Sequence, residues 1–216
     1  EQEEAKLAEE ALRAEEEAAA AAVLDGEIDE ASEAAADSIL DLQDEEPALE
    51  KITVVEQIAE DFAGIDGLIN NAGILRDGMF IKVKNDEVVK KMSLDQFQSV
   101  IDVNLTGVFL CGREAATQMI KAGRKGVIVN MSSIARQGNI GQTNYAASKA
   151  GVVAMTTTWA RELGRHGIRV GAIAPGVIKT AMTDAMKPEM RERLEKMKPV
   201  GRLGTSEEVA HTAKYI

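Results

Sequence analysis

The chain has 216 residues and a mass of 23.2 kDa, enough for one domain with a sizeable core, and its 45% hydrophobic and 28% charged residues are typical of globular proteins. Aromatic residues make up only 3%, which argues against the stacking platforms that bind single-stranded nucleic acid. The one cysteine excludes an intrachain disulfide, and no apolar run is long enough to span a membrane. We therefore expect a cytoplasmic protein that binds neither nucleic acid nor membranes.

Most of the acidic residues behind the net charge of −11 lie in residues 1–50, where Glu and Ala predominate and only Lys6 and Arg13 are basic. This composition favours helix but offers little apolar surface to bury. We therefore predict an acidic arm at 1–50, partly helical or disordered, and a mildly basic domain at 51–216.

Helical and strand patterns alternate after the arm. Apolar spacing predicts helices at 52–62, 93–122, 144–163, 189–197 and 206–216, and short apolar runs predict buried strands at 68–69, 127–129 and 168–173. Gly123 and Gly164 follow two of these helices, as is common at helix ends. Short strands that are apolar on both faces and alternate with helices indicate an α/β fold with a parallel sheet covered on both faces.

Small and polar residues follow each predicted strand, at the edge where such sheets bind ligands. They are Asn70-Asn71-Ala72-Gly73 after the first strand, Ser132-Ser133 after the second, and Ala174-Pro175-Gly176 with Ile178 and Thr180 after the third. The small residues allow a ligand to approach the backbone, and a serine hydroxyl can bond a substrate carbonyl. Each stretch alone is equally typical of an ordinary turn.

Tyr145 and Lys149 are four residues apart on a predicted helix, so their side chains lie one turn apart on the same face. A tyrosine with an ordinary pKa near 10 is a poor catalyst at neutral pH, and a neighbouring ammonium group lowers that pKa. The spacing therefore suits acid–base chemistry, although an exposed helix pair has the same spacing.

Together, in this order, the motifs resemble those of the short-chain dehydrogenase/reductase family. The resemblance runs from about Ile52 to Ile216 and includes Asn70-Asn71-Ala72-Gly73, the 102–107 stretch Asp-Val-Asn-Leu-Thr-Gly, Asn130-Met-Ser-Ser133, Tyr145-xxx-Lys149 and Pro175-Gly176. The 138–151 stretch looks most like the 3-oxoacyl-(acyl-carrier-protein) reductase branch. The resemblance implies a Rossmann-like sheet, a homo-oligomer, and NADP, with NAD as the other candidate, as cofactor.

The resemblance also implies roles for individual residues. Tyr145 would protonate a ketone while the nicotinamide delivers hydride, and Lys149 would bind the nicotinamide ribose and lower the pKa of Tyr145. Asn104 would position a water molecule of a proton relay. The substrate would be a 3-oxoacyl thioester, carried by acyl-carrier protein or coenzyme A. The strand-end residues would contact the cofactor: Asn70, Asn71, Ala72, Gly73, Pro175, Gly176, Ile178 and Thr180.

The catalytic serine has two candidates. Counting forward from Asn130 selects Ser133, whereas counting back from Tyr145 selects Ser132. We favour Ser133, because a strand fixes the direction of its side chains more firmly than a loop does.

The sequence departs from the family at both ends. The family's glycine-rich turn of the type Thr-Gly-x-x-x-Gly-x-Gly, which seats the cofactor pyrophosphate at a helix N-terminus, is absent, and the family's first strands and last strand have no counterpart. The alternative to an enzyme is therefore a non-catalytic remnant that acts as an interaction or structural protein.

Other residues are not assigned to a site. Cys111 lies in an apolar helix and is expected to pack as a small core residue. His166 and His211 lack the spacing of metal ligands, so no metal site is predicted.

Overall fold

The computed structural model describes residues 53–180, 183 and 188–216; the predicted acidic arm at 1–50 lies outside them. Its helices and strands, in chain order, are α3 (Thr53–Asp61), β1 (Gly67–Asn70), β2 (Ile81–Lys84), β3 (Glu87–Lys91), α4 (Leu94–Ile101), α5 (Gly107–Lys121), β4 (Gly126–Met131), α6 (Thr143–Leu163), β5 (Ile168–Ile173), α8 (Pro188–Lys196) and α9 (Ser206–Tyr215). Every helix and strand predicted between 52 and 216 has its counterpart here.

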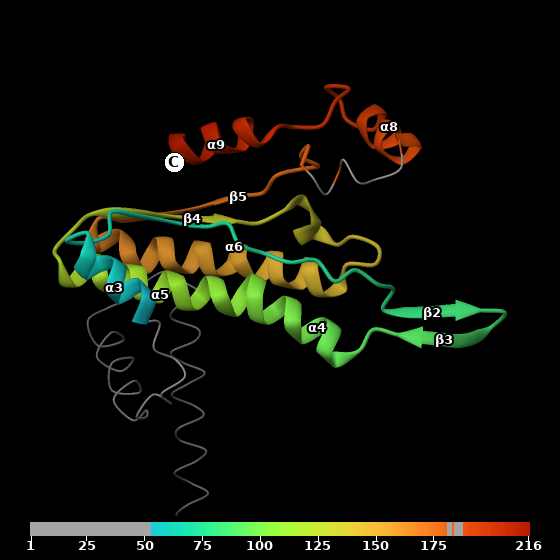
Figure 1. Cartoon of the computed structure of the whole chain (residues 1–216), viewed down its shortest axis with the longest axis horizontal. Coiled ribbons are helices and arrows are strands. Elements are labelled where there is room, and N and C mark those ends of the chain that lie inside the picture. The colour runs from blue at the N-terminus through green and yellow to red at the C-terminus, as the bar shows by residue number, and fades with distance from the viewer. Residues whose placement is uncertain (1–52, 181–182, 184–187) are drawn as a thin grey trace, which may run out of the picture. The chain divides into compact units, whose positions relative to one another are not determined.

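The three predicted strands form a parallel sheet in the order β1-β4-β5 (Figure 1). In the register, Asn70 of β1 lies opposite Asn130 of β4, and Met131 of β4 lies opposite Ile173 of β5. Because parallel strands run in one direction, the turns that follow them leave the sheet at one edge.

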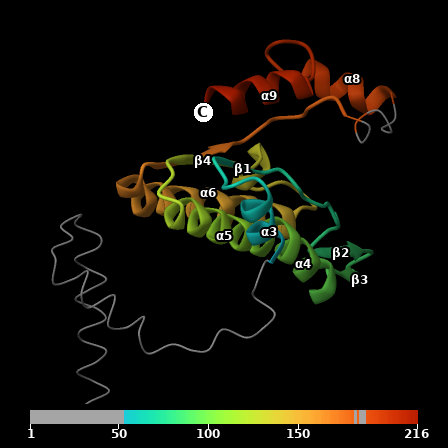
Figure 2. The same cartoon turned by 60° about the vertical axis from the view of Figure 1, so that its left-hand side comes forward.

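Helices pack on both sides of this sheet. Figures 1 and 2 show α5 and α6 together on one face, with α9 on the other side of β5. The side chain of Ile216, just after α9, lies so close to Gly171 of β5 that a Cβ added there would meet it at 3.0 Å. The prediction of an α/β fold with a parallel sheet flanked by helices is confirmed.

The main apolar core lies between α5 and the sheet. Met119 of α5, Ile128 of β4 and Ile168 of β5 have essentially no exposed surface, and Ala116 packs with them. Full burial of such side chains contributes about 1.5–3 kcal/mol each. This core fixes the sheet against its helices and therefore fixes where the strand-end turns lie.

The predicted helix at 93–122 has the right extent but contains a π-helical turn. Ser93 caps its start by accepting a hydrogen bond from the Gln96 backbone, α4 then continues into the turn at Asp102–Thr106, and α5 follows without a break. The wider turn puts the fully buried Asn104 in its middle. Turns of this kind are often found at functional sites.

The antiparallel hairpin β2–β3 was not predicted. Ile81, Lys82, Val83 and Lys84 alternate apolar and basic residues, and Asn85 and Asp86 have positive φ angles of 51° and 64° in the turn. Alternation followed by Asn-Asp is a typical hairpin pattern. Every residue of both strands is exposed to solvent, the apolar ones by about half.

None of the described helices is both long enough and apolar enough to cross a membrane.

Candidate active site

The two residues of the tyrosine–lysine pair lie on α6 and face the end of β4. The Lys149 ammonium nitrogen is 5.7 Å from the centre of the Tyr145 ring. Lys149 is buried, and its Nζ donates a 2.7 Å hydrogen bond to the backbone oxygen of Met131 at the end of β4. The pair is thus held at the edge of the sheet from which the strand-end turns leave.

The two candidate serines point in different directions. Ser132 is buried, and its hydroxyl donates to the Lys149 backbone oxygen at 2.8 Å, so it joins β4 to α6. Ser133 is half-buried, its hydroxyl accepts from the Ala135 backbone at 3.1 Å, and it is close enough to the Tyr145 phenol to lower the pKa of that phenol. The serine beside the phenol is therefore the residue favoured from the strand register.

The pKa of Tyr145 does not shift in the direction that the sequence predicts. Burial raises the pKa of the phenol most, the Ser133 hydrogen bond lowers it, and the Asp77 carboxylate raises it. Burial also lowers the pKa of Lys149, and its ammonium group is not among the causes of the Tyr145 shift. The lowering of the Tyr145 pKa by Lys149 that the resemblance implies therefore stays a prediction, and desolvation is the largest cause of the shift in this structure.

Asn104 holds the loop after β1. Its side-chain oxygen accepts from the Ile74 backbone N–H at 2.8 Å, and its amide nitrogen donates to the Ile74 oxygen at 2.9 Å. Both functional groups of the amide are thus occupied by one backbone position. The structure makes Asn104 the anchor of the segment that begins at Gly73.

Gly73 lies beside the catalytic candidates, with no side chain of its own between them and solvent. A Cβ built on it would lie 3.2 Å from the Asn104 side-chain oxygen and 3.8 Å from Lys149 Nζ. Asn71, Ala72 and Gly73 are all exposed. A ligand group can therefore approach the backbone here and reach the lysine.

Asn70 is committed to the interior. It is buried, and its amide donates to the Asn130 side chain at 2.8 Å, which in turn donates to the Thr156 hydroxyl at 2.9 Å. This chain of hydrogen bonds joins β1, β4 and α6. These hydrogen bonds give Asn70 a structural role, and its contact with a cofactor stays a prediction.

The segment after β5 lies beside the serines. The Pro175 oxygen accepts from the Ile134 backbone at 3.1 Å, and nothing approaches a Cβ built on Gly176 closer than 4.0 Å. Ile178 forms a bridge with Gly204, and the Thr180 backbone N–H donates to Thr183 at 2.8 Å. The predicted residues are thus near the site, but the Thr180 amide is already bonded within its own loop.

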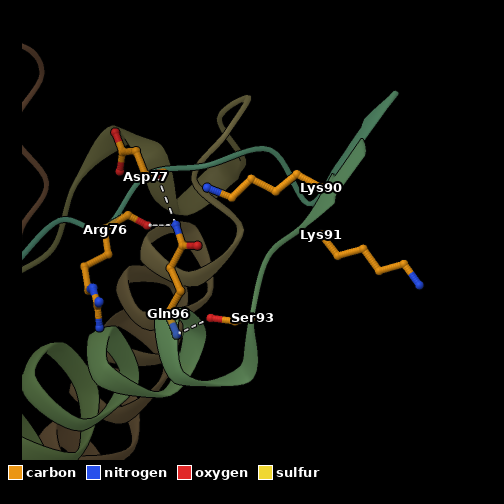
Figure 3. A pocket seen from close by; sticks show the side chains of 6 residues that line it. All are labelled: Arg76, Asp77, Lys90, Lys91, Ser93 and Gln96. Carbon is orange, nitrogen blue, oxygen red and sulfur yellow. Dashed lines mark hydrogen bonds between the residues drawn. The ribbon is translucent and has the colours of Figure 1, made fainter. Parts of the chain in front are cut away.

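Sequence reasoning missed a neighbouring pocket of about 400 Å³, open to solvent, between the hairpin and α4. Figure 3 shows the residues that line it: Arg76, Asp77, Lys90, Lys91, Ser93 and Gln96. Asp77 also accepts a 2.9 Å hydrogen bond from Gln142, three residues before Tyr145, so the pocket is joined to the start of the helix that carries the tyrosine. The signal that could have found it is the cluster of four lysines between residues 82 and 91.

Asn144 ties this region together. It is fully buried, its amide donates to the backbone oxygens of Arg76 and Gln96 at 3.0 and 2.9 Å, and its oxygen accepts from the Tyr145 backbone. The residue before Tyr145 thus fixes the start of α6 to the loop after β1 and to α4.

Among residues 53–180, 183 and 188–216, no group of three or more His, Cys, Asp or Glu side chains is placed to hold a metal ion. Cys111 is half-buried on α5, and burial raises the pKa of its thiol.

Comparison with known proteins places these motifs among reductases. Residues 2–216 match the sequence family described as enoyl-(acyl carrier protein) reductase. Over 164 residues, the chain is 45% identical to the 3-oxoacyl-(acyl-carrier-protein) reductase FabG of Thermotoga maritima and 40% identical to that of Staphylococcus aureus, covering 76% of this chain. It is 45% identical over 135 residues to (3R)-3-hydroxyacyl-CoA dehydrogenase of Mus musculus, covering 62% of this chain and 52% of that protein. The chain spans 63% of the length of the two reductases.

Proposed function

The chain belongs to the short-chain dehydrogenase/reductase family, and we propose that it acts in the NADP(H)-dependent reduction of a 3-oxoacyl thioester to the 3-hydroxyacyl thioester. The observation that carries this proposal is the grouping of the Tyr145 phenol, the nearby Ser133 hydroxyl and the Lys149 ammonium at the carboxyl edge of the sheet. The names of the relatives support the substrate class. No comparison favours the alternative of a non-catalytic interaction protein.

Tyr145 is suited to act as the acid. The phenol is protonated at neutral pH and so has a proton to give; burial, which raises its pKa, holds that proton more firmly, and the Ser133 hydroxyl acts on the pKa in the opposite direction. The Ser133 hydroxyl, close to the phenol, can donate to the same substrate oxygen. In the reaction the carbonyl oxygen takes the proton from Tyr145 Oη as the carbonyl carbon is reduced.

The residues present fit the nicotinamide end of the cofactor. Gly73 is exposed and lies beside Lys149, whose ammonium group donates one hydrogen bond, to Met131, of the three that it can make, so a polar group such as a ribose hydroxyl can reach the lysine here. When bound, the nicotinamide supplies the hydride. Lys149 would hold the ribose hydroxyls, while the anchoring of Ile74 by Asn104 keeps the Gly73 backbone in place.

NADP is proposed ahead of NAD, and a homo-oligomer in the cytoplasm is proposed as the working state; these rest on similarity to the reductases. Titration of the protein with NADPH and NADH, followed by cofactor fluorescence, tests the preference. We expect tighter binding of NADPH and loss of binding in Lys149→Ala, with Lys179→Ala as the control because that side chain is exposed after β5. Size-exclusion chromatography with light scattering tests the oligomer.

The activity is tested with acetoacetyl-N-acetylcysteamine, a 3-oxoacyl thioester without a carrier, by following the loss of NADPH absorbance. Tyr145→Phe removes the acid and should lower kcat by about 100-fold or more. Tyr215→Phe is the matched control, since that ring is 92% exposed. Ser133→Ala should lower kcat. A larger loss of kcat in Ser132→Ala would instead identify Ser132 as the catalytic serine. No turnover by the unaltered protein, or equal turnover in Tyr145→Phe, would refute the proposed function.

A further inference from the structure

We propose that the pocket between the hairpin and α4 binds the phosphate-bearing tail of the thioester carrier, with the Lys90 ammonium as its anion contact. The inference rests on the proposed function, because that function supplies a thioester on a carrier. Acyl-carrier protein and coenzyme A both attach the acyl group to a pantetheine arm that ends in a phosphate, so the shared chemistry is a phosphorylated pantetheine.

The pocket has the size and place for such a tail. Its volume of about 400 Å³ lies within the range of small-molecule sites. Asp77 lies on its wall and accepts a 2.9 Å hydrogen bond from Gln142, which precedes Tyr145 by three residues. A molecule whose ketone reaches Tyr145 therefore has this pocket next to it.

The polar groups of the α4 side of the pocket are already bonded within the protein. Arg76 donates to Asp95 at 3.2 Å and to Ser99 at 2.8 Å, and the Gln96 amide donates to the backbone oxygens of Arg76 and Asp77. Ser93 accepts from the Gln96 backbone. The side chains on this side of the pocket are therefore held in place, and the charge of Arg76 is compensated by Asp95.

The hairpin side carries the uncompensated charge. Lys90 has no ion pair or hydrogen bond with any described side chain, and Figure 3 shows its ammonium end extending across the pocket while Lys91 points away. The register places Lys90 directly opposite Lys82 on β2. Like charges directly opposite each other destabilise a strand pair, and an exposed two-stranded hairpin has little stability to lose. An anion at this position would relieve the repulsion.

Asp77 gives a second test, because its negative charge should weaken the binding of an anion in the pocket. Asp77 lines the same pocket, so its negative charge opposes a phosphate there, while its Oδ2 accepts from Gln142. Removing the lysine charge should weaken the binding of an anion, and removing the aspartate charge should strengthen it. A site that recognises only the shape of its ligand would not show these two opposite changes in anion binding.

The test compares 4′-phosphopantetheine with pantetheine, which differ only in the phosphate, by calorimetric titration of the protein. The quantity measured is the ratio of the two dissociation constants. Lys90→Ala should lower the preference for the phosphorylated probe about fivefold, as expected for one exposed unit charge near a phosphate. Lys90→Arg should retain the preference, and Asp77→Asn should increase it.

Lys84→Ala is the matched control. Lys84 lies on the same hairpin and has the same charge, but it does not line the pocket and lies opposite Glu87. Its substitution should leave the preference within about twofold, and high salt should reduce the preference in every variant. Equal binding of the two probes by the unaltered protein, or an equal effect of Lys84→Ala and Lys90→Ala, would overturn the inference.

Two further arms separate the carriers and the two proposals. Binding of coenzyme A and of phosphopantetheinylated acyl-carrier protein is measured in the same way, and the tighter complex, weakened in Lys90→Ala, identifies the source of the phosphate; no weakening of either complex overturns the inference. Reduction of acetoacetyl-N-acetylcysteamine has no phosphate to recognise. Its failure would refute the proposed function, whereas its success without a phosphate preference would refute only this inference.

Discussion

Substitution of Asn104 tests how the site is held. Asn104→Ala removes both hydrogen bonds to Ile74, at 2.8 and 2.9 Å, from a side chain with no exposed surface. A typical hydrogen bond contributes about 0.5–1.5 kcal/mol, so with the lost packing we expect unfolding to become easier by about 2–3 kcal/mol. For a chain of this size that lowers Tm by roughly 4–12 °C. Urea denaturation followed by circular dichroism measures the change in the free energy of unfolding, and thermal denaturation followed in the same way measures the change in Tm.

Gln98→Ala is the control for this experiment. Its amide donates to Asp102 at 2.7 Å on the exposed side of the same helical run, and loss of such a pair costs about 0.2–0.5 kcal/mol. Asn104→Asp keeps the acceptor for the Ile74 N–H but turns an oxygen toward the Ile74 carbonyl, so it should destabilise the protein less at about pH 4, where protonation restores a donor, than at neutral pH. An effect of Asn104→Ala no larger than that of Gln98→Ala would show that the buried amide does not anchor the loop.

Two further predictions concern the phenol and the helix packing. Burial raises the pKa of Tyr145, so its contribution to stability is complete below the unfolded value of about 10 and is lost as the pH rises through the folded pKa. Ultraviolet titration of the phenolate should show a further rise in Ser133→Ala and a fall in Asp77→Asn; the opposite signs would refute the stated causes. In the α5–α6 contact, a Cβ at Gly112 would lie 2.6 Å from the ring of Trp159, so Gly112→Ala should destabilise the protein by about 1–3 kcal/mol and change the fluorescence of its one tryptophan. Unchanged stability and emission would mean that the helices are not packed this closely.

Periodicity was sufficient for the parallel sheet and its helices. The predicted strands at 127–129 and 168–173 became β4 and β5; β4 is buried or half-buried along its whole length, and β5 is so at every residue except Arg169, which fits the largely apolar sequence of strands in a covered parallel sheet. The helix at 144–163 differs from α6 by one residue. These elements are determined locally by hydrophobic pattern and by the glycines at their ends.

The site depended on contacts that no local pattern contains. The π-helical turn around Asn104 arises within a continuous helical pattern, and the amide partners of Asn104 lie thirty residues earlier in the chain. The raised pKa of Tyr145 reflects burial by distant segments, which the Tyr-Lys spacing cannot show. The hairpin was missed although its alternation was visible, because its exposed strands contribute nothing to the core.

Transfer of deuterium from cofactor to product tests the central claim most directly. The protein is incubated with acetoacetyl-N-acetylcysteamine and NADPH deuterated at C4 of the nicotinamide, in separate samples for each face of the ring, and the product is analysed by mass spectrometry. The account predicts a 3-hydroxy product with one deuterium at C3 from one of the two labelled cofactors, and loss of this product in Tyr145→Phe but not in Tyr215→Phe. A product without the label from either cofactor, or equal labelled product in Tyr145→Phe, would contradict the assignment of this site as a nicotinamide-dependent reductase centre.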